Sequence, residues 1–288
     1  MNITSLGLIL AGPCSAESRE QLFEVARALQ ADGRVAYLRA GVWKPRTRPG
    51  QFEGMGEVAL SWLADVQQET GMRVCIEVAR AEHVSLAHRY GIRSFWLGAR
   101  TTSDPFAVQE VADSLDEGDG PFFVKNPISP DIDLWMGAIE RLAARTSQEV
   151  MAVHRGFFPP RKIAYRNAPE WDLPLQLRSR YGHRLRILCD PSHIAGKREW
   201  IAEIAQQAMN FAFDGLMIEV HPCPDCALSD ARQQLTPAAF SLLLDSLSPP
   251  PQVLEGSDAT LEMLRRKIDS VDAQILDLLG ERVAIVRD

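Results

Sequence analysis

Residues 6–30 read LGLILAGPCSAESREQLFEVARALQ, which is an apolar run, a turn and an amphipathic segment in that order. The run at 6–11 has the length and composition of a buried β-strand, and the apolar residues of 19–30 recur at the spacing of a helix. The motif GPCS lies between them, where the strand ends. The stretch therefore predicts one strand-helix unit, and the fold depends on how often that unit repeats.

The same unit recurs along most of the chain. Seven further apolar or β-branched runs follow, at residues 35–42, 74–78, 95–99, 122–124, 150–153, 185–188 and 216–220. Amphipathic stretches lie between them, for example at 57–68, 134–145 and 200–213. Eight strands alternating with eight helices are typical of a (β/α)8 TIM barrel, which we predict for residues 1–247. A doubly wound open sheet is the alternative, but no GxGxxG motif follows the first run.

Composition and charge exclude several classes of protein. The 288 residues carry a net charge of −7, so we expect no bulk attraction to nucleic acid or to a membrane, and any anion site must be local. No apolar run approaches the roughly 18 residues of a membrane span, and the N-terminus lacks the basic region of a signal peptide. We therefore expect a cytoplasmic protein. Five cysteines, an odd number, do not suggest a disulfide framework.

A second unit follows the predicted barrel. Prolines and small polar residues dominate 248–257, which predicts a linker. Residues 258–288 keep apolar positions at helical spacing to the end of the chain, which predicts one α-helix. One helix cannot bury its own apolar stripe, so it must pack on the barrel, on another copy or on residues outside this chain. We expect a homo-oligomer, with this helix as one means of association.

Four side chains that could bind a metal lie at or beyond the ends of the first, seventh and eighth predicted strands: Cys14, His193, Glu219 and Asp230. These strands are neighbours around the closure of a barrel, whose functional sites lie at the C-terminal ends of the strands. A thiolate, an imidazole and two carboxylates suit Mn, Fe, Co or Zn better than Mg or Ca. The sequence therefore predicts a divalent metal site. His221 with Cys223 and Cys226 offers a competing zinc reading, but a single CxxC is a weak signal and an ordinary loop is favoured.

Cationic side chains lie at or just past the ends of four other predicted strands: Arg39, Lys44, Arg46, Arg100, Lys125 and Arg155. Cations that point into a barrel mouth are costly unless anions meet them. Guanidinium groups match phosphate and carboxylate groups in geometry. The pattern favours one or two substrates that carry phosphate or carboxylate.

The strand-end motifs, taken in order, resemble the 3-deoxy-D-arabino-heptulosonate 7-phosphate (DAHP) synthases of the short, single-barrel type. The motifs are GPCS (12–15), KPRT (44–47), GART (98–101), VKNP (124–127), HRG (154–156), DPSH (190–193), MIEVHP (217–222) and ALSD (227–230). The resemblance implies condensation of phosphoenolpyruvate with erythrose 4-phosphate, which is the first step of the shikimate pathway. A 3-deoxy-D-manno-octulosonate 8-phosphate synthase, which uses arabinose 5-phosphate, is the rival, and a barrel that only scaffolds or regulates a mutase is the non-enzyme alternative.

The resemblance also implies roles for individual residues. It places the metal ligands on Cys14, His193, Glu219 and Asp230, the set reached above from the strand ends. It places the phosphoenolpyruvate contacts on Arg39, Arg100, Lys125 and Arg155, and the aldose phosphate contacts on Lys44, Arg46 and Thr47. Lys44, Lys125 and Asp190 are the expected catalytic residues. KPRT favours erythrose 4-phosphate, because the rival family typically has a KANR-like segment there.

Residues 261–282, LEMLRRKIDSVDAQILDLLGER, resemble the start of the first helix of an all-helical chorismate mutase. Arg265 and Arg282 match the arginines that bind substrate carboxylates in that family. The other mutase helices are absent from this chain, so we do not expect mutase activity from it. Two departures from the synthase pattern lie near a predicted ligand: the CPDC segment, and Ala231 where the family has glycine.

Overall fold

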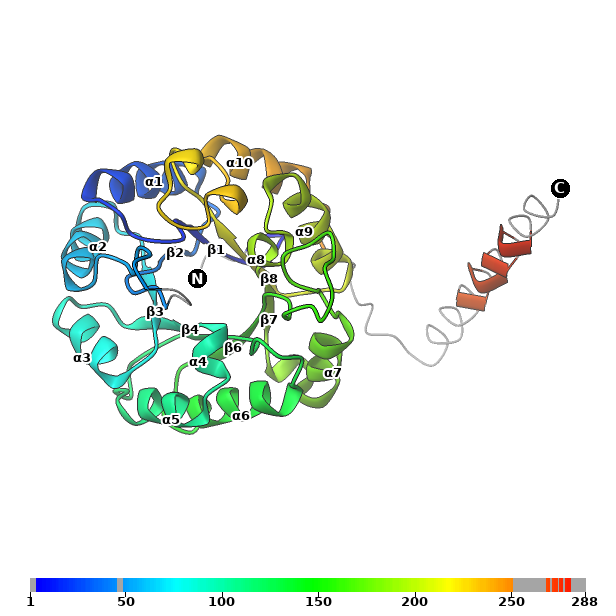
Figure 1. Ribbon diagram of the computed structural model, residues 1–288, viewed down its shortest axis with the longest axis horizontal. Helices are drawn as coiled ribbons and strands as arrows, with labels where there is room; N and C mark the ends of the chain where they lie inside the picture. The colour runs from blue at the N-terminus through cyan, green and yellow to red at the C-terminus, as the bar shows by residue number, and fades with distance from the viewer. Residues whose placement is uncertain are drawn as a thin grey trace. The chain divides into compact units, whose positions relative to one another are not determined.

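The computed structural model describes residues 4–45, 49–250, 268, 269, 271–273, 275, 276 and 278–280. Within these residues, eight parallel strands close into a barrel, because β1 pairs with both β2 and β8. The strands are β1 (Leu8–Gly12), β2 (Tyr37–Ala40), β3 (Val74–Val78), β4 (Ser94–Leu97), β5 (Phe122–Lys125), β6 (Val150–His154), β7 (Ile187–Cys189) and β8 (Gly215–Glu219). Figure 1 looks down the barrel, with the strands as the inner ring. The predicted (β/α)8 barrel is confirmed.

Helices surround the strands as an outer ring (Figure 1). The described helices of this unit are α1 (Arg19–Asp32), α2 (Glu57–Thr70), α3 (Ala81–Arg89), α4 (Ala99–Thr102), α5 (Pro105–Asp113), α6 (Ile132–Ala143), α7 (Asp172–Tyr181), α8 (Pro191–Ala195), α9 (Ile201–Asn210) and α10 (Pro237–Ser246). The short helices α4 and α8 directly follow β4 and β7, so they add to the simple alternation that the sequence predicts. Both lie at the C-terminal ends of strands, where a barrel carries its site.

Local sequence explains where the helices begin. Ser18, Asp104, Asp131 and Thr236 each accept a hydrogen bond from a backbone N–H of the first turn of α1, α5, α6 and α10. These are the residue types that satisfy the free N–H groups of a helix start. Helix α1 ends at Gly33, whose φ of 76° is a left-handed conformation that glycine adopts without strain.

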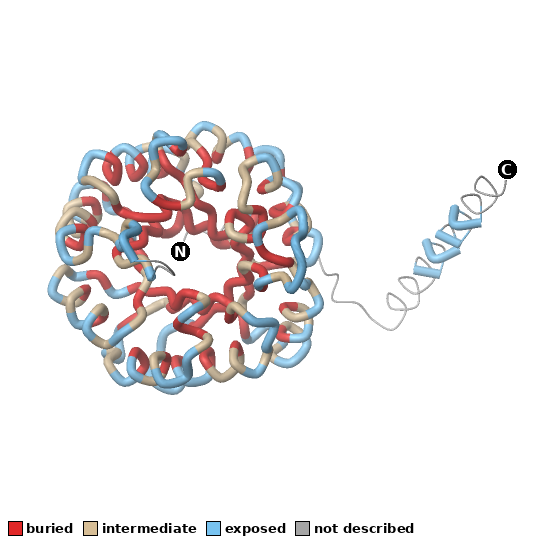
Figure 2. Tube along the Cα trace, viewed as in Figure 1, coloured by how far each residue is buried: buried red, intermediate tan, exposed pale blue. Residues whose placement is uncertain are grey.

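Successive side chains of a strand point to opposite faces of the sheet, so each strand packs one set of side chains against the surrounding helices and the other set inside the barrel. Leu38 and Ile218 belong to the core between sheet and helices, whereas Tyr37, Trp96 and Met217 belong to the cluster that fills the barrel interior. Figure 2 shows the inner ring of strands as buried. The same alternation places the next inward residue of several strands at the C-terminal mouth, and there the side chains are charged.

The chain divides into two compact units, Met1–Pro250 and Pro251–Asp288. The described residues of the second unit are helical and exposed, and include Ile268, Val271, Ile275 and Leu278. Residues 251–257 of the predicted linker and the rest of the predicted helix, with Arg265 and Arg282, lie outside the described residues. Among the described helices, none combines the length and the hydropathy needed to cross a membrane.

Candidate active site

Three of the predicted metal ligands meet at the closure of the barrel. Cys14 follows β1, Glu219 ends β8, and Asp230 lies in the loop after β8. Their ligand atoms all lie within 4.8 Å of one another, and Cys14 Sγ is 3.5 Å from Asp230 Oδ2. The approach of β1 to β8 is fixed by the sheet, since Gly12 is the register partner of Glu219.

His193 faces the same cluster from the short helix α8. Its Nε2 atom lies 3.8 Å from Glu219 Oε1 and 3.8 Å from Asp230 Oδ2. Asp190 begins this helix: its Oδ1 accepts from the backbone N–H of His193 at 3.0 Å, and its Oδ2 lies 2.8 Å from His193 Nδ1. One carboxylate therefore caps the helix and orients the ring. Burial lowers the pKa of His193, which favours the neutral imidazole that a metal requires.

The electrostatics of the four groups fit a divalent cation. Burial, reinforced by the nearby Glu219 carboxylate, raises the pKa of the Cys14 thiol to about 12. Burial also raises the pKa of Glu219, but His193 and Arg39 outweigh it and the net pKa lies below the ordinary value. Arg166 and His193 likewise hold the pKa of Asp230 low against the effect of burial. The cluster thus offers two carboxylates, an imidazole and a thiol that must lose its proton to bind a metal.

Two buried cations lie on the floor of the mouth. Arg39 donates to Glu219 Oε1 at 2.7 Å, and its guanidinium carbon lies 4.7 Å from the centre of the Trp96 ring. Lys125 donates to Asp190 Oδ2 at 2.7 Å and lies 5.8 Å from the centre of the same ring. Trp96, fully buried inside the barrel, therefore supports both cations from below.

A cavity of about 250 Å³ opens above this floor. It is lined by Lys44, Pro45, Gln51, Glu77, Gly98, Ala99, Arg100, Lys125, Arg155, Arg166, His193 and Asp230. Burial, opposed by Asp190 and reinforced by Arg166 and Arg100, lowers the pKa of Arg155 to about 10. A guanidinium whose charge is disfavoured in this way gains from an anionic ligand. The cavity is therefore suited to phosphate or carboxylate groups.

Lys44 joins the cation-lined cavity to the cluster of potential metal ligands. Its Nζ donates to the backbone oxygen of Cys14 at 2.9 Å. Burial lowers the pKa of Lys44, but the opposing effects of Cys14 and Glu77 are together larger, so the net pKa lies above the ordinary value. Lys44 is therefore a cationic hydrogen-bond donor at neutral pH. The other two residues predicted to hold the aldose phosphate, Arg46 and Thr47, lie outside the described residues.

The CPDC segment differs from both interpretations of the sequence, a zinc site and an ordinary loop. Cys223 and Cys226 are joined by a disulfide, which the sequence analysis does not predict. His221 Nδ1 accepts from the backbone N–H of Cys223 at 3.0 Å, so that ring nitrogen is occupied. Within the described chain, no group of potential metal ligands includes these three residues. The sequence cannot reveal the pairing, because spacing alone does not show how the loop folds.

Four site residues are missed by the sequence analysis: Glu77, Arg166, Gln233 and Gln234. Glu77 and Arg166 line the cavity, and Gln234 Oε1 accepts from the backbone N–H of Cys14 at 2.9 Å. Glu77 occupies an inward-facing position near the C-terminal end of β3. This position in the strand is a signal that could have identified it. Arg166 and Gln234 lie in loops and Gln233 ends a short 3₁₀ turn, and no periodicity in the sequence predicts the path of such segments.

The fold and the site define a class of protein: a (β/α)8 barrel enzyme with a cluster of potential metal ligands beside a cavity lined by cationic side chains. More particularly, residues 5–248 match the DAHP synthetase I family, and the chain belongs to that family.

Known relatives agree with this assignment. A phospho-2-dehydro-3-deoxyheptonate aldolase of Thermotoga maritima is 32% identical over 239 residues, which cover 83% of this chain and 68% of the relative. A 2-dehydro-3-deoxyphosphooctonate aldolase of Nitratidesulfovibrio vulgaris is 25% identical, and the match covers 83% of this chain and 90% of the relative. The crystal structure of the Thermotoga maritima DAHP synthase superposes with a TM-score of 0.73 at 30% identity, covering 83% of this chain and 67% of that one.

Proposed function

We propose that the chain condenses phosphoenolpyruvate with D-erythrose 4-phosphate and water to give DAHP and phosphate, using a divalent metal ion held by Cys14, His193, Glu219 and Asp230. Family membership and the similarity to the Thermotoga maritima enzyme support the reaction. The observation that carries the proposal is the convergence of the four ligand side chains beside a cation-lined cavity.

The aldehyde of the sugar must be activated, because the enol carbon of phosphoenolpyruvate is a weak nucleophile. A bound divalent ion supplies a Lewis acid for the aldehyde oxygen. Lys44 remains cationic and lies next to Cys14, so it is placed to donate a hydrogen bond or a proton to the alkoxide that develops.

The arginine-rich side of the cavity is suited to phosphoenolpyruvate. Arg100, Arg155 and Lys125 line it together, and they can hold a phosphate and a carboxylate in one orientation. Arg39 lies deeper, tied to Glu219, and links that anion site to the metal ligands. Asp190 positions Lys125 and His193 by contacting both.

Arabinose 5-phosphate is the alternative aldose, because relatives named 2-dehydro-3-deoxyphosphooctonate aldolase also match the chain. Their identity of 25% is lower than the 32% of the Thermotoga maritima relative. The KPRT motif at 44–47 also favours the four-carbon sugar.

The decisive experiment measures phosphate release from phosphoenolpyruvate with each aldose phosphate in turn. The purified chain is first treated with EDTA and then reloaded with Mn²⁺ or Co²⁺. We expect turnover with erythrose 4-phosphate, little with arabinose 5-phosphate, and none without metal or without aldose. A preference for arabinose 5-phosphate would contradict the proposal that erythrose 4-phosphate is the aldose substrate. Undiminished turnover in excess EDTA would contradict the proposal that the reaction requires a metal ion.

We further propose that residues 258–288 are the first helix of a chorismate mutase-like unit. The resemblance of 261–282 to that helix supports this, as does the helical conformation of its described residues.

A further inference from the structure

A buried glutamine links the two carboxylates of the metal-binding cluster. Gln233 is 1% exposed and ends the 3₁₀ turn Ala231–Gln233. Its backbone N–H donates to the backbone oxygen of Asp230 at 3.1 Å. This turn folds the chain after Asp230 back toward β8. Gln233 Nε2 then donates to Glu219 Oε2 at 2.7 Å, and Gln233 Oε1 accepts from Arg166 at 2.6 Å.

The chemistry of the partners fixes the orientation of this amide. An ionised carboxylate only accepts hydrogen bonds and a guanidinium only donates them. Turning the amide over would place oxygen against oxygen at Glu219 and N–H against N–H at Arg166. Only a side chain with a donor and an acceptor at its end satisfies both neighbours.

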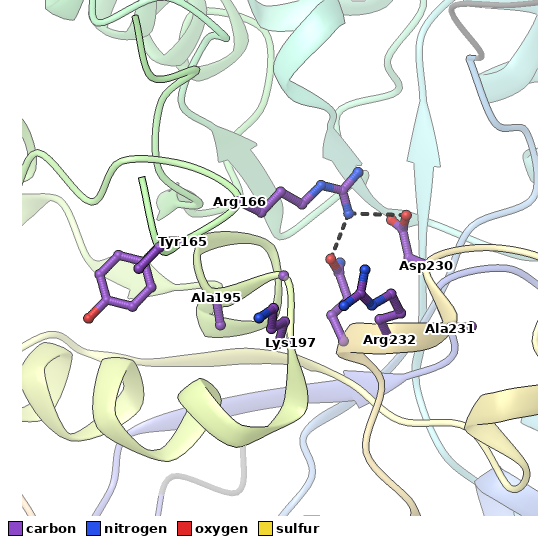
Figure 3. A pocket seen from close by; sticks show the side chains of 10 residues that line it. Tyr165, Arg166, Ala195, Lys197, Asp230, Ala231 and Arg232 are labelled. Atoms are coloured by element: carbon purple, nitrogen blue, oxygen red, sulfur yellow. Dashed lines mark hydrogen bonds and ion pairs between the residues drawn. The ribbon is translucent and has the colours of Figure 1, made fainter. Parts of the chain in front are cut away.

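Arg166 extends this connection to the second carboxylate. The same NH1 atom lies 3.0 Å from Asp230 Oδ1. Figure 3 shows the end of the Arg166 side chain directed toward Asp230, with the interaction between them dashed. Arg166 lines both the cavity of about 250 Å³ and a second cavity of about 420 Å³. Glu219, Gln233, Arg166 and Asp230 thus form one continuous chain of polar contacts.

We propose that Gln233 is a positioning residue that sets the orientation of the Glu219 carboxylate and thereby the affinity of the site for its metal ion. The inference rests on the proposed metal-dependent function. Glu219 Oε1 is held by Arg39, so Gln233 is the second anchor that prevents the carboxylate from rotating about that contact. Without Gln233, Glu219 Oε2 loses the hydrogen bond that Gln233 gives it inside a fully buried site.

The test replaces Gln233 by methionine, which has a similar length and no hydrogen-bonding amide. The matched control is Gln207→Met on α9, because Gln207 also accepts at Oε1, from Trp171, and donates at Nε2, to the Glu203 carboxylate. Affinity for Mn²⁺ is measured on the full chain by electron paramagnetic resonance of the free ion. Thermal unfolding of the metal-free proteins shows that each variant is folded. Gln233→Asn, which keeps an amide too short to span both partners, replaces Gln233→Met if the latter does not fold.

We expect Gln233→Met to weaken Mn²⁺ binding by about 10- to 100-fold, the usual effect of losing a group that orients a metal ligand. Gln207→Met should bind as the wild type does. Wild-type affinity in the folded Gln233 variant, or an equal loss in Gln207→Met, overturns the positioning role and leaves the proposed function intact. A wild-type chain that binds no Mn²⁺ or Co²⁺ overturns both.

Discussion

At the scale of single residues, Cys14 shows how the environment of a side chain decides its role. The thiol is fully buried beside Glu219 and Asp230, and its pKa of about 12 keeps it protonated at neutral pH in the absence of a metal. A protonated thiol is a poor nucleophile, so the surroundings disfavour nucleophilic catalysis. The same surroundings suit metal binding, because a divalent cation next to the sulfur replaces the proton and stabilises the thiolate.

This predicts that metal uptake releases a proton from Cys14. The pKa is raised, so the thiol holds its proton at every pH below about 12, and Mn²⁺ affinity should rise by up to about tenfold per pH unit between about pH 7 and about pH 9. Proton release on addition of Mn²⁺ is measured with a pH indicator in weak buffer. Cys14→Ala should release no proton from this position. Cys75→Ala, which removes another buried thiol with a raised pKa, should behave as the wild type. Equal proton release from all three proteins would refute the assignment.

At the scale of elements, the five-residue helix α8 depends on Asp190 for its place. Asp190 contacts the first turn of the helix, the His193 ring and Lys125, and none of its surface is exposed. Such a short helix has little stability of its own. The orientation of the His193 ring therefore depends on the buried ion pair between Lys125, at the end of β5, and Asp190, directly after β7.

Asp190→Asn should consequently destabilise the fold. The new amide keeps an oxygen to cap α8, but its NH2 group faces the ammonium of Lys125, which leaves a buried cation without its partner. We expect the free energy of unfolding to fall by about 3–5 kcal/mol. The check is urea denaturation of the metal-free protein. Asp104→Asn, which changes the exposed cap of α5 to another good capping residue, should cost less than about 0.5 kcal/mol. A similarly small effect at Asp190 would contradict this account.

The strands and most of the helices could be predicted from the sequence because their signals are local. The run at 74–78 coincides with β3, and the stretch at 57–68 lies inside α2. Inward alternation and parallel neighbours then bring together side chains such as Cys14 and Glu219, which are far apart in the chain. Gln233 and Arg166 escape the same reasoning, because loop paths depend on tertiary contacts. Arg46 and Thr47, by contrast, remain predictions from the family resemblance.

At the scale of the whole molecule, the barrel and the C-terminal unit differ in whether they bury their own apolar side chains. The barrel closes its own sheet and buries its own core within the described part of Met1–Pro250. The described residues of the second unit expose Ile268, Val271, Ile275 and Leu278 at helical spacing. A stripe of this kind is unfavourable in water and drives association. We infer that the barrel carries stability and catalysis, and that the C-terminal helix contributes to self-association.

A chain ending at Pro250 should therefore keep the activity and thermal stability of the barrel while associating less. Light scattering should give a larger mass for the full chain than for the shortened one at equal concentration. The double variant Val271→Lys and Leu278→Lys keeps the full length but places charges in the apolar stripe, so it should resemble the shortened chain. If all three proteins have the same number of subunits, the barrel alone sets the oligomeric state. If the shortened chain unfolds or loses activity, the barrel depends on residues beyond Pro250, and the division of roles between the two units is wrong.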